Sequence, residues 1–376
     1  MIKMNFPTDI IARKALEQHF YNSLRGAFEE TAINNLLIGA IYNGIQLDLK
    51  SILTASFDEL FNISETIKTF FIGNIARYQD FCNHFNYDDF RHLLYNFFIE
   101  EDIKNNIDLC TCYYCNIDFI NTYDNRATYI NKVDFLNRAS QDELNQIPGI
   151  SNKTSVLIIN QRVISPIKDL SLSFMTEGKS KKILNFKLQH PKGIFTLDHF
   201  FPQHSFKTIS ISLYNLIPSC GPCNSRFKHA ANFQIGKNTT YMSPSSNNYV
   251  LGEFQVFGLL LRPGKNISNV KNVNDIYLTY EDYLFGQEEF LEIFNIPARY
   301  SFHKKEAVKL ILKFQRYPQS NIDEIERSLK KSVDRKTIMK DLFGSDLFDE
   351  ISSNQPLAKL RRDIANQIGL TEQLNS

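Results

Sequence analysis

The feature that most constrains this 376-residue chain is a repeated spacing of its cysteines. Four of the six cysteines form two Cys-x-x-Cys pairs, Cys112 with Cys115 and Cys220 with Cys223. Two thiolates on one tight turn can reach the same zinc ion at about 2.3 Å, and four sulfur ligands close a tetrahedral site with no open position for a substrate. In a reducing compartment this pairing indicates metal ligation rather than disulfides. We therefore predict a structural zinc site; the alternative is a set of buried free thiols.

The two pairs lie far apart in the sequence, because residues 116–219 separate Cys115 from Cys220. That is much more chain than a zinc knuckle requires. The entropic cost of closing a loop grows only logarithmically with its length, so an insert that folds by itself and has adjacent ends costs little. We expect such an insert between the pairs. Cys82 and Cys110 lack a partner at this spacing and are expected to be ordinary core or surface thiols.

The composition indicates a globular protein. The apolar fraction of 43% and the charged fraction of 22% are close to globular averages, and the length allows two or three packed units. No apolar run approaches the roughly 18 residues that cross a bilayer, and the first residues lack the pattern of a secretion signal. We therefore expect a cytoplasmic protein without membrane contact. The net charge of +1 argues against attraction of nucleic acid by the whole surface, so any such site must be local.

Hydrophobic periodicity predicts an α+β fold that is predominantly helical. Apolar residues recur at three- and four-residue spacing through the N-terminal region and again after about residue 279. A short β-prone run ends at Asp198-His199, and a second apolar run leads through Pro218 toward Cys220. Residues 235–265 contain clusters of Gly, Pro, Ser and Asn, which indicate loops.

The stretch between the cysteine pairs carries helix signals of its own. Ser140 and Glu143 form a capping box, and Ser151 can cap a following helix. The run 136–170 resembles the helix-hairpin-helix module of DNA-uptake and repair proteins, with Gly149-Ile150-Ser151 in place of the usual Gly-Ile-Gly. The resemblance implies that backbone N–H groups at Gly149 and Ser151 hold a DNA phosphate without reading sequence, with added charge from Lys153. The alternative is a helical hairpin used only for packing.

A second resemblance rests on three short blocks. They are Leu197-Asp198-His199-Phe200-Phe201-Pro202, then Tyr214-Asn215-Leu216-Ile217-Pro218-Ser219-Cys220, then Cys223-Asn224. Together they resemble the ββα-metal motif of HNH endonucleases, in the subgroup with two Cys-x-x-Cys pairs around the site. The resemblance implies a DNA endonuclease in which His199 is the general base. Asp198 and Asn224 would be ligands of the catalytic metal ion, and Asn215 would tether the loop.

The residue types suit the hydrolysis of a phosphodiester. The reaction needs a deprotonated water, and histidine has the ordinary pKa nearest to neutrality. Mg²⁺, with Mn²⁺ as an alternative, would neutralise charge on the transition state and steady the leaving 3′ oxygen. The resemblance implies products with 5′-phosphate and 3′-hydroxyl ends. An Asp-His pair at a strand end is by itself more often structural, but the flanking cysteine pairs favour catalysis here. His204 and His229 match no motif position, and His229 is a candidate DNA contact only.

With these motifs placed, the chain divides into four expected parts. They are an N-terminal helical region, a nuclease core with the zinc site, an insert with the helix-hairpin-helix and a basic linker, and a C-terminal region that is loop-rich and then helical. Their predicted bounds are 1–108, 109–130 with 188–235, 131–187, and 236–376, respectively.

The C-terminal region extends the resemblance. With the HNH blocks, the runs 304–307, 341–344 and 356–364 look like the nuclease subunits of bacterial anti-phage systems such as Septu and some retrons. That resemblance implies a defence effector paired with an ATPase subunit. The insert and the long N-terminal region depart from the short members of that group, which leaves the mode of ATPase docking open.

Two further classes of function stay open on the sequence. One is a zinc-stabilised DNA-binding or adaptor module whose nuclease site is inactive. The other is an HNH nuclease that acts on RNA or serves genetic mobility. Metal-dependent cleavage, a comparison of substrates and the identity of the neighbouring gene would separate these classes.

Overall fold

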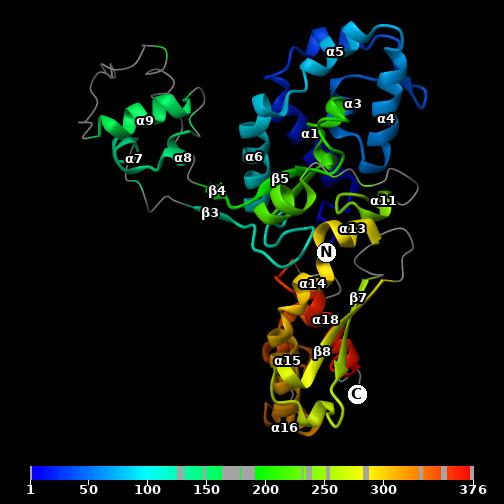
Figure 1. The fold of residues 1–376 in the computed structure, drawn as a ribbon, viewed down its shortest axis with the longest axis vertical. Helices are drawn as coiled ribbons and strands as arrows, with labels where there is room; N and C mark the ends of the chain where they lie inside the picture. Colours follow the sequence, from blue (N-terminus) through cyan, green and yellow to red (C-terminus); the bar gives the residue numbers. More distant parts are fainter. Residues whose placement is uncertain are drawn as a thin grey trace. The chain divides into compact units, whose positions relative to one another are not determined.

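The computed structural model describes most of the chain (Figure 1). The residues that it leaves out are 1, 125–128, 130–131, 146, 148–149, 163–177, 179–190, 230, 232, 234–238, 251–254, 283–287, 330–332, 349–353 and 373–376. The chain forms two compact units. The first combines Met1–Asn121 with Phe195–Ser376, and the second is Thr122–Ile194.

The first unit begins with a set of helices, several of which are capped at their start by a side chain. Asp9 accepts hydrogen bonds from the first N–H groups of α1, and Asp48 and Ser51 form a capping box at the start of α3. The elements of this region are α1 (Ile10–Arg25), α2 (Glu30–Leu36), β1 (Ile41–Tyr42), β2 (Ile45–Gln46), α3 (Leu49–Thr54), α4 (Phe57–Phe70), α5 (Ile75–Asn83) and α6 (Tyr87–Ile103).

Two short antiparallel strands follow in the same unit. Strand β5 (Thr196–His199) pairs with β6 (Leu216–Ser219), and His199 lies opposite Leu216. The β-prone run that ends at Asp198-His199 is therefore confirmed as a strand, and the second apolar run contains its partner strand. The connection contains two single 3-10 turns, and a π-helical segment follows β6. These elements are η1 (Lys207–Ile209), η2 (Leu213–Asn215) and η3 (Pro222–Lys228).

Aromatic rings join the N-terminal helices to these strands. Phe57 of α4 stacks on Phe201 and meets Phe200 edge-on, with ring centroids 5.1 Å apart in both pairs. The buried Ser212 hydroxyl donates to the carbonyl of Ile52 in α3 at 2.7 Å. The N-terminal helices and the two strands thus share one hydrophobic core.

The C-terminal part of the first unit is built on a strand pair and a set of helices. Side chains of the last helix bond the backbone of one strand: Gln367 bonds both the N–H and the carbonyl of Leu259, and Asp363 accepts from the N–H of Phe257. The main elements are α11 (Thr239–Met242), β7 (Gln255–Leu261), β8 (Ile276–Asp282), α13 (Glu288–Phe294), α14 (Ile296–Ser301), α15 (Lys304–Arg316), α16 (Gln319–Ser328), α17 (Arg335–Phe343) and α18 (Ala358–Gln367).

Strand β7 corrects the prediction of a loop-rich segment at 235–265. Its seven residues pair along their whole length with β8, from Gln255 opposite Asp282 to Leu261 opposite Ile276. Gly258 allows the close pairing, because a Cβ there would lie 2.3 Å from the Thr279 hydroxyl oxygen. Pro, Ser, Asn and Gly residues occupy the described turns at 244–245, 247–248 and 263–264, and they obscured a strand whose partner lies beyond them in the sequence.

The second unit has its own hydrophobic core (α7–α9 in Figure 1). Strand β3 (Thr122–Asp124) pairs antiparallel with β4 (Pro191–Gly193), so the two ends of the unit are adjacent. Ser140 and Glu143 form the predicted capping box at the start of α8. The unit is wider than the expected insert 131–187. Its helices are α7 (Lys132–Arg138), α8 (Gln141–Leu144) and α9 (Asn152–Asn160).

The described structure is mostly helical with small sheets, in agreement with the predicted α+β class. Among the residues described, no helix combines the length and the apolar character needed to cross a membrane.

We predict that the first unit folds without the second. A short Gly-Ser linker that joins Tyr123 to Lys192 should preserve the fold of the first unit, because these two residues are register partners in the β3–β4 pair. Circular dichroism and the metal content of the shortened protein would check this. Aggregation of the shortened protein, with loss of bound metal, would show that the first unit depends on the insert.

Candidate metal centre and active site

The four predicted cysteines come together in the first unit. Their Sγ atoms all lie within 4.8 Å of one another, and all four residues are buried. They are the one group of three or more potential metal-ligating side chains within the described part of the chain. The cluster can therefore hold a metal ion, and its four thiols fit the structural zinc site predicted above.

Two tight turns present these sulfur atoms. In the first, the Cys112 N–H donates to the Asp118 carbonyl at 2.9 Å and the Asn116 N–H donates to the Cys112 carbonyl at 2.8 Å. Asn116 has a φ of 52°, a left-handed conformation that asparagine tolerates. In the second, the Cys223 N–H points at the Cys220 sulfur at 3.4 Å. Backbone hydrogen bonds thus fix the two turns that present the cysteine sulfur atoms.

Arg299 of α14 lies against this cluster. Its Nη1 is 3.2 Å from the Cys223 sulfur, and its Nη2 pairs with Asp118 at 3.3 Å. Burial lowers the pKa of Arg299, but the nearby Cys115 and Cys223 sulfurs raise it, and the net effect is a pKa above the ordinary value. A guanidinium here offsets part of the negative charge that four thiolates around a zinc ion would carry. The sequence contained no signal for Arg299, because it lies 76 residues beyond Cys223.

Burial also bears on the charge of the cysteines. It raises the pKa of the Cys112 thiol well above the ordinary value. Four buried thiolates at this separation would repel one another without a cation among them, whereas a bound divalent ion stabilises all four in the deprotonated form. The other two cysteines lie outside the cluster: Cys82 is buried and Cys110 is half-buried.

Asp198 lies close to the cysteine turns. Its carboxylate is buried and accepts a hydrogen bond from the Tyr114 hydroxyl at 2.6 Å, and Tyr114 stands between the two cysteines of the first turn. The second partner is Lys228, whose Nζ lies 3.0 Å from Oδ2 and 3.3 Å from Oδ1. Burial raises the pKa of Asp198, and Lys228 and Tyr114 oppose that rise.

This arrangement does not fit a magnesium ion at Asp198. Mg²⁺ binds carboxylate and water oxygens at about 2.0–2.1 Å in octahedral geometry. Both oxygens of Asp198 instead face the ammonium of Lys228. Asn224, the second predicted ligand, is half-buried on η3, and its N–H donates to the Cys220 carbonyl at 3.1 Å. The sequence indicated neither Lys228 nor Tyr114 as a partner of Asp198.

His199 is the last residue of β5, and its imidazole is mostly enclosed. The ring meets Tyr87 of α6 edge-on, with centroids 4.6 Å apart, and hydrogen bonds to the backbone of Ser210. Within the described part of the chain, its Nε2 is shielded from solvent and has no hydrogen-bond partner. Burial is the main cause that lowers the pKa of His199 to about 4, and the nearby positive charge of Lys228 lowers it further. The imidazole is therefore neutral at physiological pH.

The enclosure of His199 is unexpected for a general base, because the base of a nuclease must reach a water molecule beside the scissile phosphate. Tyr87 comes from the N-terminal helical region, and periodicity alone predicts only that such a residue lies on a helix. Asn215 is buried: its amide donates to the carbonyls of Phe201 and Ile209, and its oxygen accepts from the N–H of Phe201 at 2.8 Å. These bonds hold the loop that follows His199.

The predicted DNA contacts of the hairpin are described only in part. Ser151 is the N-cap residue of α9, and Lys153 is exposed in its first turn. Gly149 lies outside the described residues. Phosphate binding at this hairpin therefore stays a prediction.

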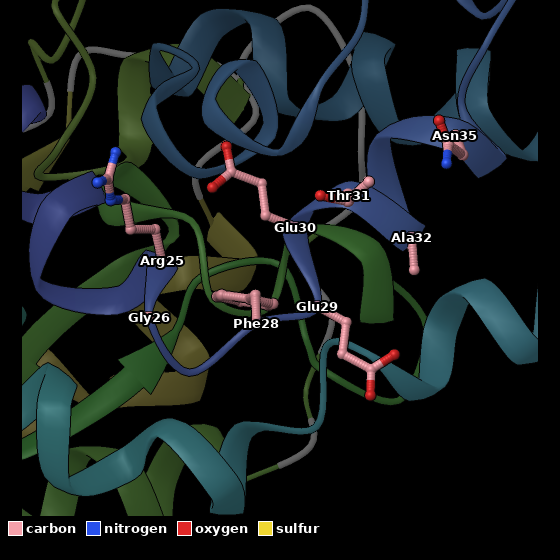
Figure 2. Close-up of a pocket in the computed structure, with 8 residues that line it drawn as sticks. All are labelled: Arg25, Gly26, Phe28, Glu29, Glu30, Thr31, Ala32 and Asn35. Atoms are coloured by element: carbon pink, nitrogen blue, oxygen red, sulfur yellow. The ribbon is translucent and has the colours of Figure 1, made fainter.

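A surface depression lies beside α2 in the first unit (Figure 2). None of its lining residues belongs to the predicted site, and one of them, Glu30, already accepts a hydrogen bond from Tyr21. The lining residues are Arg25, Gly26, Phe28, Glu29, Glu30, Thr31, Ala32 and Asn35.

We expect one zinc ion per chain, held by the cysteine cluster. A structural zinc site contributes on the order of 10 kcal/mol to folding, so Cys223→Ser should lose the metal and unfold. Elemental analysis and thermal melting would measure both effects. The matched control is Cys110→Ser, which should keep one zinc because Cys110 lies outside the cluster. A folded wild-type protein without bound metal would disprove the zinc assignment.

The His199 imidazole should titrate at about pH 4 in NMR spectra of the folded protein. Its ordinary value is 6.5, so between pH 6.5 and 4 the unfolded chain binds a proton that the folded chain does not. This residue should therefore reduce folding stability as pH falls through that window. Tyr87→Ala exposes the ring and should move its pKa back toward the ordinary value. Titration of wild-type His199 near 6.5 would contradict the burial described here.

Comparisons with known proteins identify no relative of this chain. No family model matches it, and neither the curated proteins nor the solved structures give a significant match. A functional conclusion must therefore come from the residues and their geometry.

Proposed function

We propose that this protein is a DNA endonuclease of the HNH type in which His199 is the general base. One observation carries the proposal. A neutral histidine ends a strand with one ring nitrogen engaged by the backbone of Ser210, which leaves Nε2 as a proton acceptor without a partner among the described residues. A buried, unpartnered acceptor costs free energy, and such costs are typical of functional sites.

The chemistry proposed for this site is hydrolysis of a phosphodiester, in which His199 transfers one of the protons. Nε2 of His199 removes a proton from water, the resulting hydroxide attacks the phosphorus, and the bond to the 3′ oxygen breaks. The leaving oxygen takes a proton from solvent. Because Nε2 is shielded from solvent, side chains around the ring must move before water can reach it, and Tyr87 is one neighbour of the ring. We assign no step to Mg²⁺ or Mn²⁺, because Lys228 and Tyr114 bond the carboxylate of Asp198.

Asn215 and Lys228 would have supporting roles. Asn215 fixes the loop after His199 through the backbone of Phe201 and Ile209. Lys228 donates to the His199 carbonyl at 2.6 Å, which ties the end of β5 to η3. Both residues therefore limit the movement of the base relative to the strand pair.

The biological setting proposed is anti-phage defence. It rests on the resemblance of the C-terminal region to nuclease subunits of Septu-type and retron systems, and it includes an ATPase as the partner. Co-expression with the product of a neighbouring ATPase gene, followed by purification of a stable complex, would test this extension.

A second candidate function is a DNA-binding or adaptor module with an inactive nuclease site. The enclosure of His199 beneath Tyr87 and the neutralisation of Asp198 by a buried lysine favour it. DNA binding without cleavage, in the presence or absence of divalent ions, would decide for this module. Cleavage of RNA alone would instead support the third class of function named above.

We expect His199→Ala to abolish cleavage while it preserves fold and metal content. Loss of a general base typically reduces the rate by about 10²–10⁴. Purified protein would be incubated with plasmid DNA and with RNA, in Mg²⁺, Mn²⁺ or EDTA. His204→Ala is the matched control, because His204 is exposed and should retain the wild-type rate. Undiminished cleavage by His199→Ala would remove His199 from the mechanism.

A further inference from the structure

Lys228 is an unusual residue in this site because its charged end is almost completely buried. The residue is 2% exposed, and its side chain ends between the two oxygens of Asp198 and the backbone carbonyl of His199. Its Nζ also lies 5.8 Å from the centre of the Phe233 ring. A buried ammonium needs such partners, because removal from water is costly. The structure therefore provides a complete binding site for one positive charge.

The backbone around Lys228 is as specialised as its side chain. Lys228 is the last residue of the π-helical segment η3, which directly follows Cys220 and Gly221. A π-helix has more residues per turn than an α-helix and is frequent at functional sites. It changes which side chain faces β5. The next residue, His229, has a φ of 45°, so the chain turns sharply after placing Lys228.

A divalent cation at Asp198 would have to share this carboxylate with Lys228. Asp198 carries a single negative charge, and Nζ lies within 3.3 Å of both of its oxygens. An ion bound to either oxygen would therefore lie close to an ammonium of like sign, in a buried environment where charges are weakly screened. Tyr114 takes a further position on Oδ2. The two cations are mutually exclusive at this carboxylate in the conformation described.

We propose that Lys228 is a built-in cation that excludes divalent metal ions from Asp198 in the DNA-free protein. The inference rests on the proposed function, because it concerns the regulation of the same site. Metal ions can load at Asp198 only after the ammonium withdraws. The affinity of the free protein for Mg²⁺ or Mn²⁺ is thus set by Lys228 rather than by Asp198 and Asn224.

The test is the binding of Mn²⁺ to the full-length, DNA-free protein with its cysteine site already filled with zinc. Calorimetry or electron paramagnetic resonance would measure the affinity. Lys228→Met removes the charge and should bind one Mn²⁺ at least tenfold more tightly than wild type. Lys228→Gln keeps a hydrogen-bond donor for Asp198 and should show the same gain if the methionine variant fails to fold. Lys228→Arg is the matched control and should bind as weakly as wild type.

Asp198→Asn provides a comparison that needs no change at Lys228. Wild type and Asp198→Asn should bind Mn²⁺ with equally low affinity, because Lys228 blocks the carboxylate in the wild type and the variant has no carboxylate. Asp198→Asn combined with Lys228→Gln should lose the gain of the single Lys228 variant. The proposal is overturned if the neutral Lys228 variants gain no affinity, or if wild type has a Mn²⁺ site that Asp198→Asn destroys. Cleavage is not the readout, so a failure of the nuclease proposal would be seen separately.

Discussion

The packing of four cysteines into one cluster is the constraint on which the candidate site depends. It joins the turn after α6 to the turn after β6, two segments that are separated by the whole second unit. Each turn is linked to a residue that contacts Asp198. Tyr114 lies between the two cysteines of the first pair, and Lys228 is the last residue of η3, which contains Cys223 of the second pair. A metal ion in the cluster would therefore hold both partners of Asp198 in place. Loss of that ion would disturb the candidate site around Asp198 as well as the fold.

Distant parts of the first unit stabilise this centre. Arg299 of α14 contacts a cysteine sulfur, and the Tyr300 hydroxyl donates to the Cys115 carbonyl at 2.7 Å. Closer to the C-terminus, Asn354 bonds Thr111 and Asp108, and the Leu357 N–H donates to the Asn116 carbonyl. From the N-terminal side, Tyr87 of α6 covers His199. The N-terminal and C-terminal helical regions therefore both contribute contacts to the candidate site.

The buried pair of Asp198 and Lys228 is costly to maintain. An ion pair of this kind rarely adds net stability, because desolvation of both charges cancels much of their attraction. Its position next to His199, and its contact with the His199 carbonyl, give it a role in the organisation of the site. The same pair explains why the expected magnesium site and the described geometry disagree. The resemblance implies that Asp198 and Asn224 bind a metal ion, but Lys228, which lies outside the motif, pairs with the Asp198 carboxylate.

Features that depend on local spacing could be predicted from the amino-acid sequence. The two cysteine pairs, the capping box at Ser140 and the short strands around Asp198 and Pro218 follow from residue types a few positions apart, where local backbone preferences are strong. The tertiary structure alone decided which distant side chains meet at the site. Tyr114 and Asp198 are 84 residues apart, and Arg299 is 76 residues from Cys223. Nothing in a local pattern records such pairings, because they depend on how helices and strands pack after the chain has collapsed. The π-helical turn that directs Lys228 toward Asp198 is decided in the same way, since no local pattern in residues 222–228 indicates which side chain turns inward.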